Sequence, residues 1–341
     1  MKILILTDEL SKRFSSVSEA VVYAALEKHI DCEPLDLSDL IIDPIRTSSP
    51  EYIKKISDHI KEEMAEAVLC TSSYSMKLMS AVRAQEDNYV YCCCLVSECF
   101  GSPLLPCNDL DCYFAAHEDI KNALIKRGIP EGRIFVTGVP VKKSFRERIG
   151  KMAARNYLVI PRSKRVYLLM SEGLSGNYII RLCEELKNSE QHDYLVYIPT
   201  VRYSEIKDQL MKYSMKDPHV RVITYTQKLN LYIESADVML LKPDAVTSTE
   251  AAVSGVPMVH LFQGRDIQEE NGDFFAKHEM AVIANSIRDA ADKAKRFIEE
   301  KAMAARVIQM QYRNICSDAA DRILDIINKE YRKWKVESSR S

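Results

Sequence analysis

Short apolar runs alternate with helical patterns along the first part of the chain. The run Ile3–Leu6 comes first and precedes a helical pattern over about Ser16–His29. Further strands are predicted at Ala67–Cys70, Tyr89–Val96, Cys112–Ala115 and Arg133–Val136, with helical patterns at Glu51–Glu66 and Glu118–Arg127. Strands that are apolar on both faces are typical of parallel sheets covered by helices on both sides.

The same alternation restarts after residue 164. Strands are predicted at Val166–Met170, Tyr194–Ile198, Val220–Thr224, Val238–Leu241 and Met258–Phe262, and helices at Tyr178–Asn188, Ser204–Tyr213, Thr247–Ser254, Asp289–Ile308 and Ser317–Trp334. We therefore predict an α/β protein with two doubly wound Rossmann-like domains, at residues 1–145 and 146–315, and a C-terminal helix within 316–341 that crosses back to the first domain. In such sheets ligands bind beyond the carboxyl ends of the strands, and a cleft between two domains is the default site.

Composition narrows the class of partner. The 341 residues carry a formal net charge of -2 and no long basic run, which argues against nucleic acid, because phosphate binding needs clustered Lys and Arg. The 10 cysteines lack the pairwise spacing of a metal site. Cys92–Cys94 lies in an apolar run, where thiols act as small hydrophobes. We expect a cytoplasmic protein without a metal ion or a cofactor.

Membrane contact is expected to be peripheral at most, at the inner face of the cell membrane. The N-terminal apolar run is too short for a secretory signal, and no stretch approaches the roughly 18 apolar residues of a membrane span. The pattern over Ser75–Arg83, with Met76, Leu78 and Met79, fits either a helix at the membrane interface or a helix that faces the core.

The most informative segment is a strand, a loop and a helix between residues 237 and 257. The strand ends at Leu241, the loop is Lys242–Val246, and the helix is predicted to begin near Thr247. Its N-terminal amides and its dipole suit an anion such as a diphosphate. Glu250, placed in the first turn, is suited to accept two hydrogen bonds from a ribose diol. The alternative is a capping box between Thr247 and Glu250.

A second polar patch follows this helix. Gln268 and Asn271 are three residues apart and share a face if the segment is helical. Side-chain amides both donate and accept hydrogen bonds, as recognition of sugar hydroxyls requires. A solvated helix start is the alternative.

Nearly the full chain resembles the processive diacylglycerol glucosyltransferases and the plant monogalactosyldiacylglycerol synthases, which belong to one GT-B group with the bacterial peptidoglycan GlcNAc transferase. The resemblance rests on four segments: Asp111–Ile120 with Gly128–Val141, Ala154–Pro161, Lys242–Pro257 and Asn271–Phe275. It implies a GT-B fold, in which two domains face a cleft, and a nucleotide-sugar site in the second domain.

The resemblance also implies roles for single residues. Glu250 would bind the ribose of a UDP-sugar, while Asp244, Ala245, Val246 and Thr247 would hold its diphosphate. Gln268 and Asn271 would contact the sugar. Gly173 falls at the family's glycine-rich turn, where backbone can approach a phosphate, although an ordinary tight turn explains it equally well. Tyr225 falls at the uracil and either stacks on the base or packs structurally.

Several departures from the family fall on residues that carry its chemistry. Phe14 stands where the family has a histidine after its glycine-rich loop, and Asp244 and Ala245 replace two glycines in the donor loop. A carboxylate beside a diphosphate is repulsive. An inverting transfer needs a base near the acceptor hydroxyl. Glu98 is our candidate for that catalytic base, followed by Asp8 and Glu9; His117, which precedes a helix, is interpreted as structural.

The sequence thus predicts a glycosyltransferase that moves a hexose, with inversion, from a UDP-sugar to a lipid resembling diacylglycerol or to another acceptor. Two alternatives stay open. The first is a catalytically degenerate relative that binds a nucleotide-sugar or a partner without transfer, which the lost histidine favours. The second is a nucleotide-sugar epimerase, because epimerases share the GT-B architecture.

Overall fold

The computed structural model describes residues 1–7, 12–40, 49–85, 90–97, 107–200, 206–224, 226–261 and 268–338. Their contacts divide the chain into two units. The first unit is Met1–Lys143 together with Cys316–Ser341, and the second is Ser144–Ile315. The short helix α6 (Lys143–Arg146) contains the boundary between them. Each unit is described below by itself.

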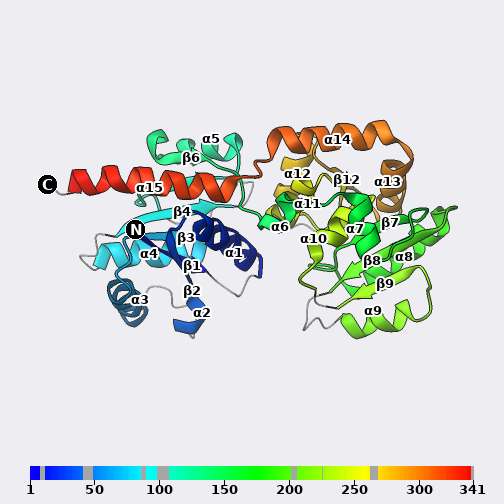
Figure 1. The fold of residues 1–341 in the computed structure, drawn as a ribbon, viewed down its shortest axis with the longest axis horizontal. Helices are drawn as coiled ribbons and strands as arrows, with labels where there is room; N and C mark the ends of the chain where they lie inside the picture. Colours follow the sequence, from blue (N-terminus) through cyan, green and yellow to red (C-terminus); the bar gives the residue numbers. More distant parts are fainter. Residues whose placement is uncertain are drawn as a thin grey trace. The chain divides into compact units, whose positions relative to one another are not determined.

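The first unit contains a parallel six-stranded sheet in the order β2-β1-β3-β4-β5-β6 (Figure 1). Its strands are β1 (Lys2–Thr7), β2 (Asp31–Asp36), β3 (Ala67–Cys70), β4 (Tyr91–Val96), β5 (Cys112–Ala115) and β6 (Ile134–Val136). Its helices are α1 (Lys12–Glu27), α2 (Leu37–Leu40), α3 (Pro50–Glu62), α4 (Ser73–Gln85), α5 (Glu118–Lys126) and α15 (Ala319–Ser338), with a 3₁₀ turn at Glu131–Arg133.

Helix α4 faces the core of this unit rather than an interface. Met76, Leu78, Met79 and Val82 are all buried in it. Of the two interpretations of Ser75–Arg83, the core-facing one is therefore confirmed. Cys92–Cys94 are fully buried free thiols in β4, as expected of cysteines that act as small hydrophobes.

The C-terminal helix α15 belongs to the first unit, in which it packs against α1. Its Tyr331 ring lies 6.1 Å from the ring of Tyr91 on β4, and Trp334 lies 5.8 Å from the same ring. The Tyr331 hydroxyl donates to Glu66 at 2.7 Å. An aromatic cluster and a polar anchor thus join the last helix to the first unit.

The second unit contains another parallel sheet, in the order β12-β11-β10-β7-β8-β9 (Figure 1). Its strands are β7 (Arg165–Leu169), β8 (Tyr194–Pro199), β9 (Val220–Ile223), β10 (Val238–Leu241), β11 (Met258–Leu261) and β12 (Val282–Ala284). Its helices are α7 (Lys151–Tyr157), α8 (Gly176–Ser189), α9 (Lys207–Ser214), α10 (Leu229–Ser235), α11 (Ala245–Ser254), α12 (Gln268–Lys277), α13 (Ile287–Glu299) and α14 (Lys301–Asn314).

These two sheets confirm the predicted fold class, two Rossmann-like domains of the GT-B type. One prediction about the tail is wrong: residues 289–308 do not form a single helix, because α13 ends at Glu299 and Glu300 leaves helical geometry at φ -93° and ψ 78° before α14 begins. None of the helices in the described ranges is both long and apolar enough to cross a bilayer.

Candidate functional site

The order in which the chain adds strands to the second sheet reverses between β7 and β10, which are neighbours although they are three strands apart in the chain. Strands β8 and β9 lie on one side of this point, and β11 and β12 lie on the other. The backbone amide of Met170, directly after β7, donates to the carbonyl of Leu240 on β10 at 2.9 Å. Helices α8 and α11 therefore both begin at the carboxyl edge, next to the junction of β7 and β10, where doubly wound sheets bind their ligands.

The start of α11 differs from the prediction. The helix begins at Ala245 rather than Thr247, and Asp244 is its N-cap, with extended backbone at φ -138° and ψ 157°. The Asp244 carboxylate accepts a hydrogen bond from the Thr247 amide at 2.8 Å. Thr247 is thus the third helical residue and not the cap, so the alternative of a Thr247–Glu250 capping box is wrong.

This cap has an electrostatic consequence for the proposed diphosphate site. The amides of Ala245 and Val246, at the first two helical positions, have no acceptor within the helix. The amide of Thr247 is already bound to a carboxylate that is 7% exposed. Asp244 therefore places a negative charge at the helix terminus that would otherwise attract an anion.

Glu250 is the sixth residue of α11, so it lies just beyond the first turn in which it was predicted. Its side chain is 5% exposed. A ribose could reach this carboxylate only through the small part of its surface that is open.

Sequence reasoning missed a polar residue that fixes α11 to the sheet. His260 is fully buried on β11, and its Nε2 lies 3.2 Å from the Ser248 hydroxyl on α11. Burial lowers the pKa of His260 to about 3, so the ring is neutral at pH 7. Its Nδ1 has no hydrogen-bond partner among the described residues. The sequence contained a signal for this residue, because His260 is the one ionisable residue in the apolar run 258–262. A histidine buried in such a strand has to be neutral and needs a hydrogen-bond partner.

The turn after β7 contains the predicted glycine. Gly173 has a φ of +73°, in the left-handed region that glycine adopts without strain. The turn closes through the Leu174 amide, which donates to the Ser171 carbonyl at 3.2 Å. Ser175 then caps α8 by accepting from the Tyr178 amide at 3.3 Å. The turn explains why a glycine is needed and also exposes backbone at the edge where β7 meets β10.

The remaining predicted residues are only partly described. Gln268 and Asn271 both lie on α12, which follows β11, so the segment is helical and the two residues are one turn apart. Asn271 is 1% exposed, and the side chain of Gln268 lies outside the described residues. Tyr225 and Glu98, together with the alternative bases Asp8 and Glu9, also lie outside the described residues.

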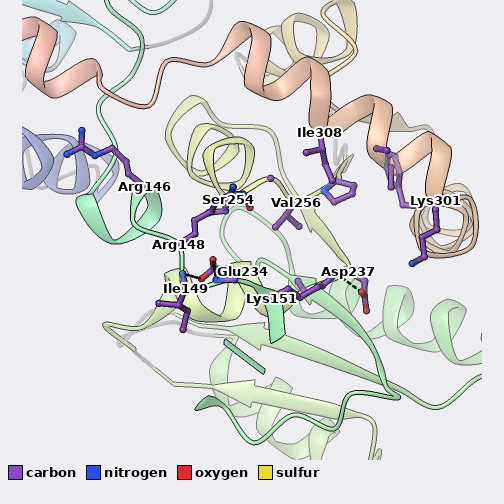
Figure 2. A pocket seen from close by; sticks show the side chains of 17 residues that line it. Arg146, Arg148, Ile149, Lys151, Glu234, Asp237, Ser254, Val256, Lys301 and Ile308 are labelled. Atoms are coloured by element: carbon purple, nitrogen blue, oxygen red, sulfur yellow. Dashed lines mark hydrogen bonds and ion pairs between the residues drawn. The ribbon is translucent and has the colours of Figure 1, made fainter. Parts of the chain in front are cut away.

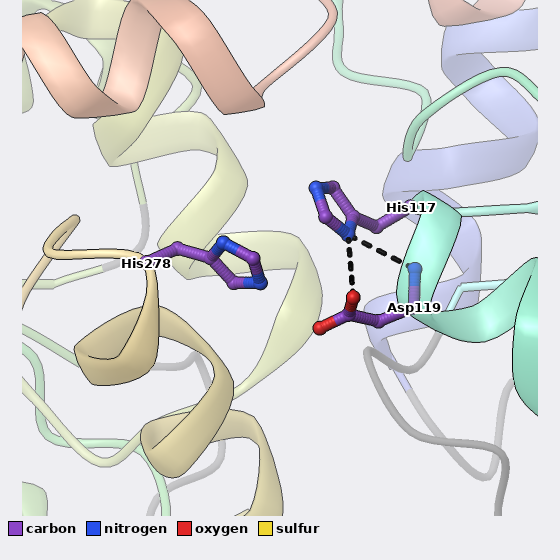
Figure 3. Close-up of side chains that lie close together, drawn as sticks. All are labelled: His117, Asp119 and His278. Carbon is purple, nitrogen blue, oxygen red and sulfur yellow. Dashed lines mark hydrogen bonds and ion pairs between the residues drawn. The ribbon is translucent and has the colours of Figure 1, made fainter.

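His117 has a structural role in the first unit, as interpreted from the sequence. It is the N-cap of α5, and its Nδ1 accepts a hydrogen bond from the Asp119 amide at 3.2 Å (Figure 3).

Comparisons with known proteins agree with the resemblance inferred from sequence. No protein-family model matches the chain. The chain is 28% identical over 225 residues to a processive diacylglycerol beta-glucosyltransferase of Staphylococcus epidermidis, a match that covers 62% of the chain and 56% of the relative. The chain thus spans little more than half the length of the curated relatives it matches.

Solved structures share the fold. UDP-GlcNAc 2-epimerase from Neisseria meningitidis, bound to UDP-GlcNAc, superposes with a TM-score of 0.71 at 14% identity, over 96% of this chain and 100% of that one. MurG from Acinetobacter baumannii gives a TM-score of 0.64 at 11% identity, over 96% and 100%. At these identities the likeness establishes the GT-B architecture.

Proposed function

We propose that this chain is a glycosyltransferase that takes a hexose from a UDP-sugar and transfers it to a lipid or another hydroxyl acceptor. The main support is the position of the α11 N-terminus, at the point where the strand order of the second sheet reverses. This N-terminus lies in a segment that resembles the donor site of the relatives. In this assignment the turn at Gly173 and the amides of Ala245 and Val246 hold the diphosphate. Glu250 binds the ribose, Tyr225 meets the uracil, and Gln268 and Asn271 contact the sugar.

The transfer itself is a displacement at the anomeric carbon. The acceptor hydroxyl oxygen attacks this carbon, the bond from the carbon to the diphosphate oxygen breaks, and UDP leaves with the electron pair. The hydroxyl proton passes to a carboxylate, which we assign to Glu98. Inversion follows because a single displacement places the new bond on the opposite face of the sugar.

Calorimetric titration with UDP, UDP-glucose, UDP-galactose and UDP-GlcNAc tests the donor site. We expect one of the three sugars to bind, and Glu250→Gln to weaken it at least tenfold, because an amide accepts fewer hydrogen bonds from the diol than a carboxylate. The matched control is Glu184→Gln on α8, where the side chain is exposed. Absence of binding by all four nucleotides would reject the proposal.

Transfer is tested separately, with radiolabelled donor and diacylglycerol in mixed micelles. Glu98→Gln should abolish transfer while the donor dissociation constant stays within twofold of the parent value. Transfer by this variant at the parent rate would show that Glu98 is not the catalytic base, and it would not contradict the proposed donor site.

A second candidate function is a nucleotide-sugar binder that does not catalyse transfer. The Asp244 carboxylate on the Thr247 amide favours it, because an anion already occupies part of the diphosphate site. Donor binding without product formation, across lipid and soluble acceptors, would support this candidate. Transfer that depends on Glu98 would reject it.

A further inference from the structure

A pocket lies at the edge of the second sheet opposite to the start of α11. It has a volume of about 790 Å³ and adjoins the amino ends of β10 and β11. Its walls are the first half of α14, the turn Ser254–Pro257, the residues just before β10, and the segment 146–151 (Figure 2). All of them belong to the second unit. Among the described residues, none of those assigned to the nucleotide-sugar lines this pocket.

The pocket is rich in positive charge. In the part of the chain that the structure describes, four cationic side chains line it, Arg146, Arg148, Lys151 and Lys301, against two carboxylates. Both carboxylates are engaged by donors of the protein. Glu234 accepts hydrogen bonds from the backbone amides of Ile149 at 3.3 Å and Gly150 at 2.8 Å.

The Asp237 carboxylate accepts more hydrogen bonds than that of Glu234. It accepts from Lys151 at 2.6 Å, from the buried Arg155 guanidinium at 2.7 Å and from the Val166 amide at 2.8 Å. Because one carboxylate serves two cations here, the positive charge around the pocket is not neutralised by its own acids.

Lys301 adds to this excess. It is the first residue of α14 and is exposed, and its side chain makes no hydrogen bond or ion pair with the described residues. A cation at this position opposes the positive end of the helix dipole. Burial, and the charges of Arg155 and Lys301, hold the pKa of Lys151 below its usual value despite the ion pair with Asp237. The two ammonium groups therefore repel each other across the pocket, and a bound anion would relieve that repulsion.

The rest of the pocket is apolar. Phe297, Ala304 and Ile308 on α13 and α14 face it, as does Val256 in the turn. Figure 2 shows Ile308 on the α14 wall and Val256 in the turn below it, with Lys151, Glu234 and Asp237 on the far side. Its volume is that of a site for a small molecule rather than for a single ion.

We propose that this pocket binds a small metabolite that carries a phosphate ester. The phosphate would lie between Lys301 and Lys151, and the body of the molecule would lie against α14. Arg148, which also lines the pocket, is held in place because it donates to the Ser254 carbonyl at 2.9 Å and to the Tyr312 hydroxyl. The proposal does not depend on the nucleotide-sugar site, which lies at the other edge of the sheet.

Calorimetry with inorganic phosphate, pyrophosphate and glycerol 3-phosphate tests the site on the full chain. We expect glycerol 3-phosphate to bind more tightly than inorganic phosphate, because only the ester contacts the apolar wall. Lys301→Gln should weaken it at least tenfold, since a hydrogen bond to a charged group is lost together with the charge. Lys212→Gln, an exposed lysine on α9, is the matched control and should leave binding unchanged.

Two further variants separate this site from the proposed diphosphate site and from a general effect of charge. Ala305→Phe adds bulk to the pocket lining without changing the charge and should also weaken binding at least tenfold. Glu250→Gln should have no effect. Binding that both Lys301→Gln and Ala305→Phe leave unchanged would place the anion outside this pocket and overturn the proposal, as would an absence of binding by all three probes.

Discussion

The carboxylate of Asp244 is the feature that most directly tests the assignment of the diphosphate site. It bonds to the Thr247 amide at 2.8 Å, so a diphosphate at the start of α11 has to approach within a few ångströms of it or displace it. Asn caps helices about as well as Asp. Asp244→Asn therefore removes the charge while keeping the hydrogen bond that begins the helix.

The expected change in the free energy of UDP binding follows from Coulomb's law. Two unit charges about 5 Å apart interact by about 3 kcal/mol at an effective dielectric constant of about 20, and by about 0.8 kcal/mol at the value for water. Removal of the repulsion should therefore tighten UDP binding by about 1–3 kcal/mol, or roughly fivefold to 150-fold. The same substitution loses a favourable charge at the helix N-terminus, so the free energy of unfolding should fall by about 0.3–1 kcal/mol.

Calorimetry with UDP at two salt concentrations, together with urea unfolding, provides the measurement. Part of the gain should disappear at high salt, because screening weakens the repulsion. Asp292→Asn on α13, an exposed residue, changes the net charge by the same amount and should leave UDP affinity unchanged. Equal affinity of Asp244→Asn and the parent protein would show that the diphosphate does not lie at the start of α11.

Three other substitutions test the second unit. Gly255→Ala should lower stability by at least 1–3 kcal/mol in urea unfolding, because φ is +69° and the added carbon would lie 2.0 Å from the Tyr312 hydroxyl; Gly132→Ala, with open space around it, is the control. Because the pKa of His260 is about 3 in the folded protein, only the unfolded state binds a proton there between about pH 6.5 and pH 3. The free energy of unfolding should therefore fall by about 1.4 kcal/mol for each pH unit below about pH 6.5. His260→Gln should reduce this slope. Arg155→Met should cost about 1.5–3 kcal/mol, measured by the same method, because it removes a charged hydrogen-bond donor from Asp237, which keeps only Lys151 as a cationic partner among the described residues.

Most of both sheets could be predicted from apolar runs, and the exceptions have a physical reason. Strand β2 is at an edge, and its residues are exposed or only partly buried, so it contains no apolar run. Strand β12 is at an edge as well and has three residues. The central strands are buried on both faces and therefore leave a clear hydrophobic signal.

The start of α11 shows where local patterns mislead. Thr247 followed three residues later by Glu250 matches a capping box, yet Asp244 is a stronger cap than threonine and follows Pro243, which cannot donate a backbone hydrogen bond. The phosphate pocket could not be predicted at all. Its lining comes from segments that begin near residues 146, 234, 254 and 297, and only the folded sheet brings their charges together.

Asp244 also determines what the start of α11 can offer to a ligand. An N-terminus needs an acceptor for its free amides, and either a carboxylate or a phosphate can supply it. Here the protein supplies its own acceptor, because the Asp244 carboxylate accepts a hydrogen bond from the Thr247 amide. In the proposed function a diphosphate either binds the amides of Ala245 and Val246 beside this cap or displaces it, and displacement costs about 1 kcal/mol. In both cases the Asp244 charge stays close to the proposed diphosphate, so its repulsion costs more binding free energy than the hydrogen bond that the cap can give up.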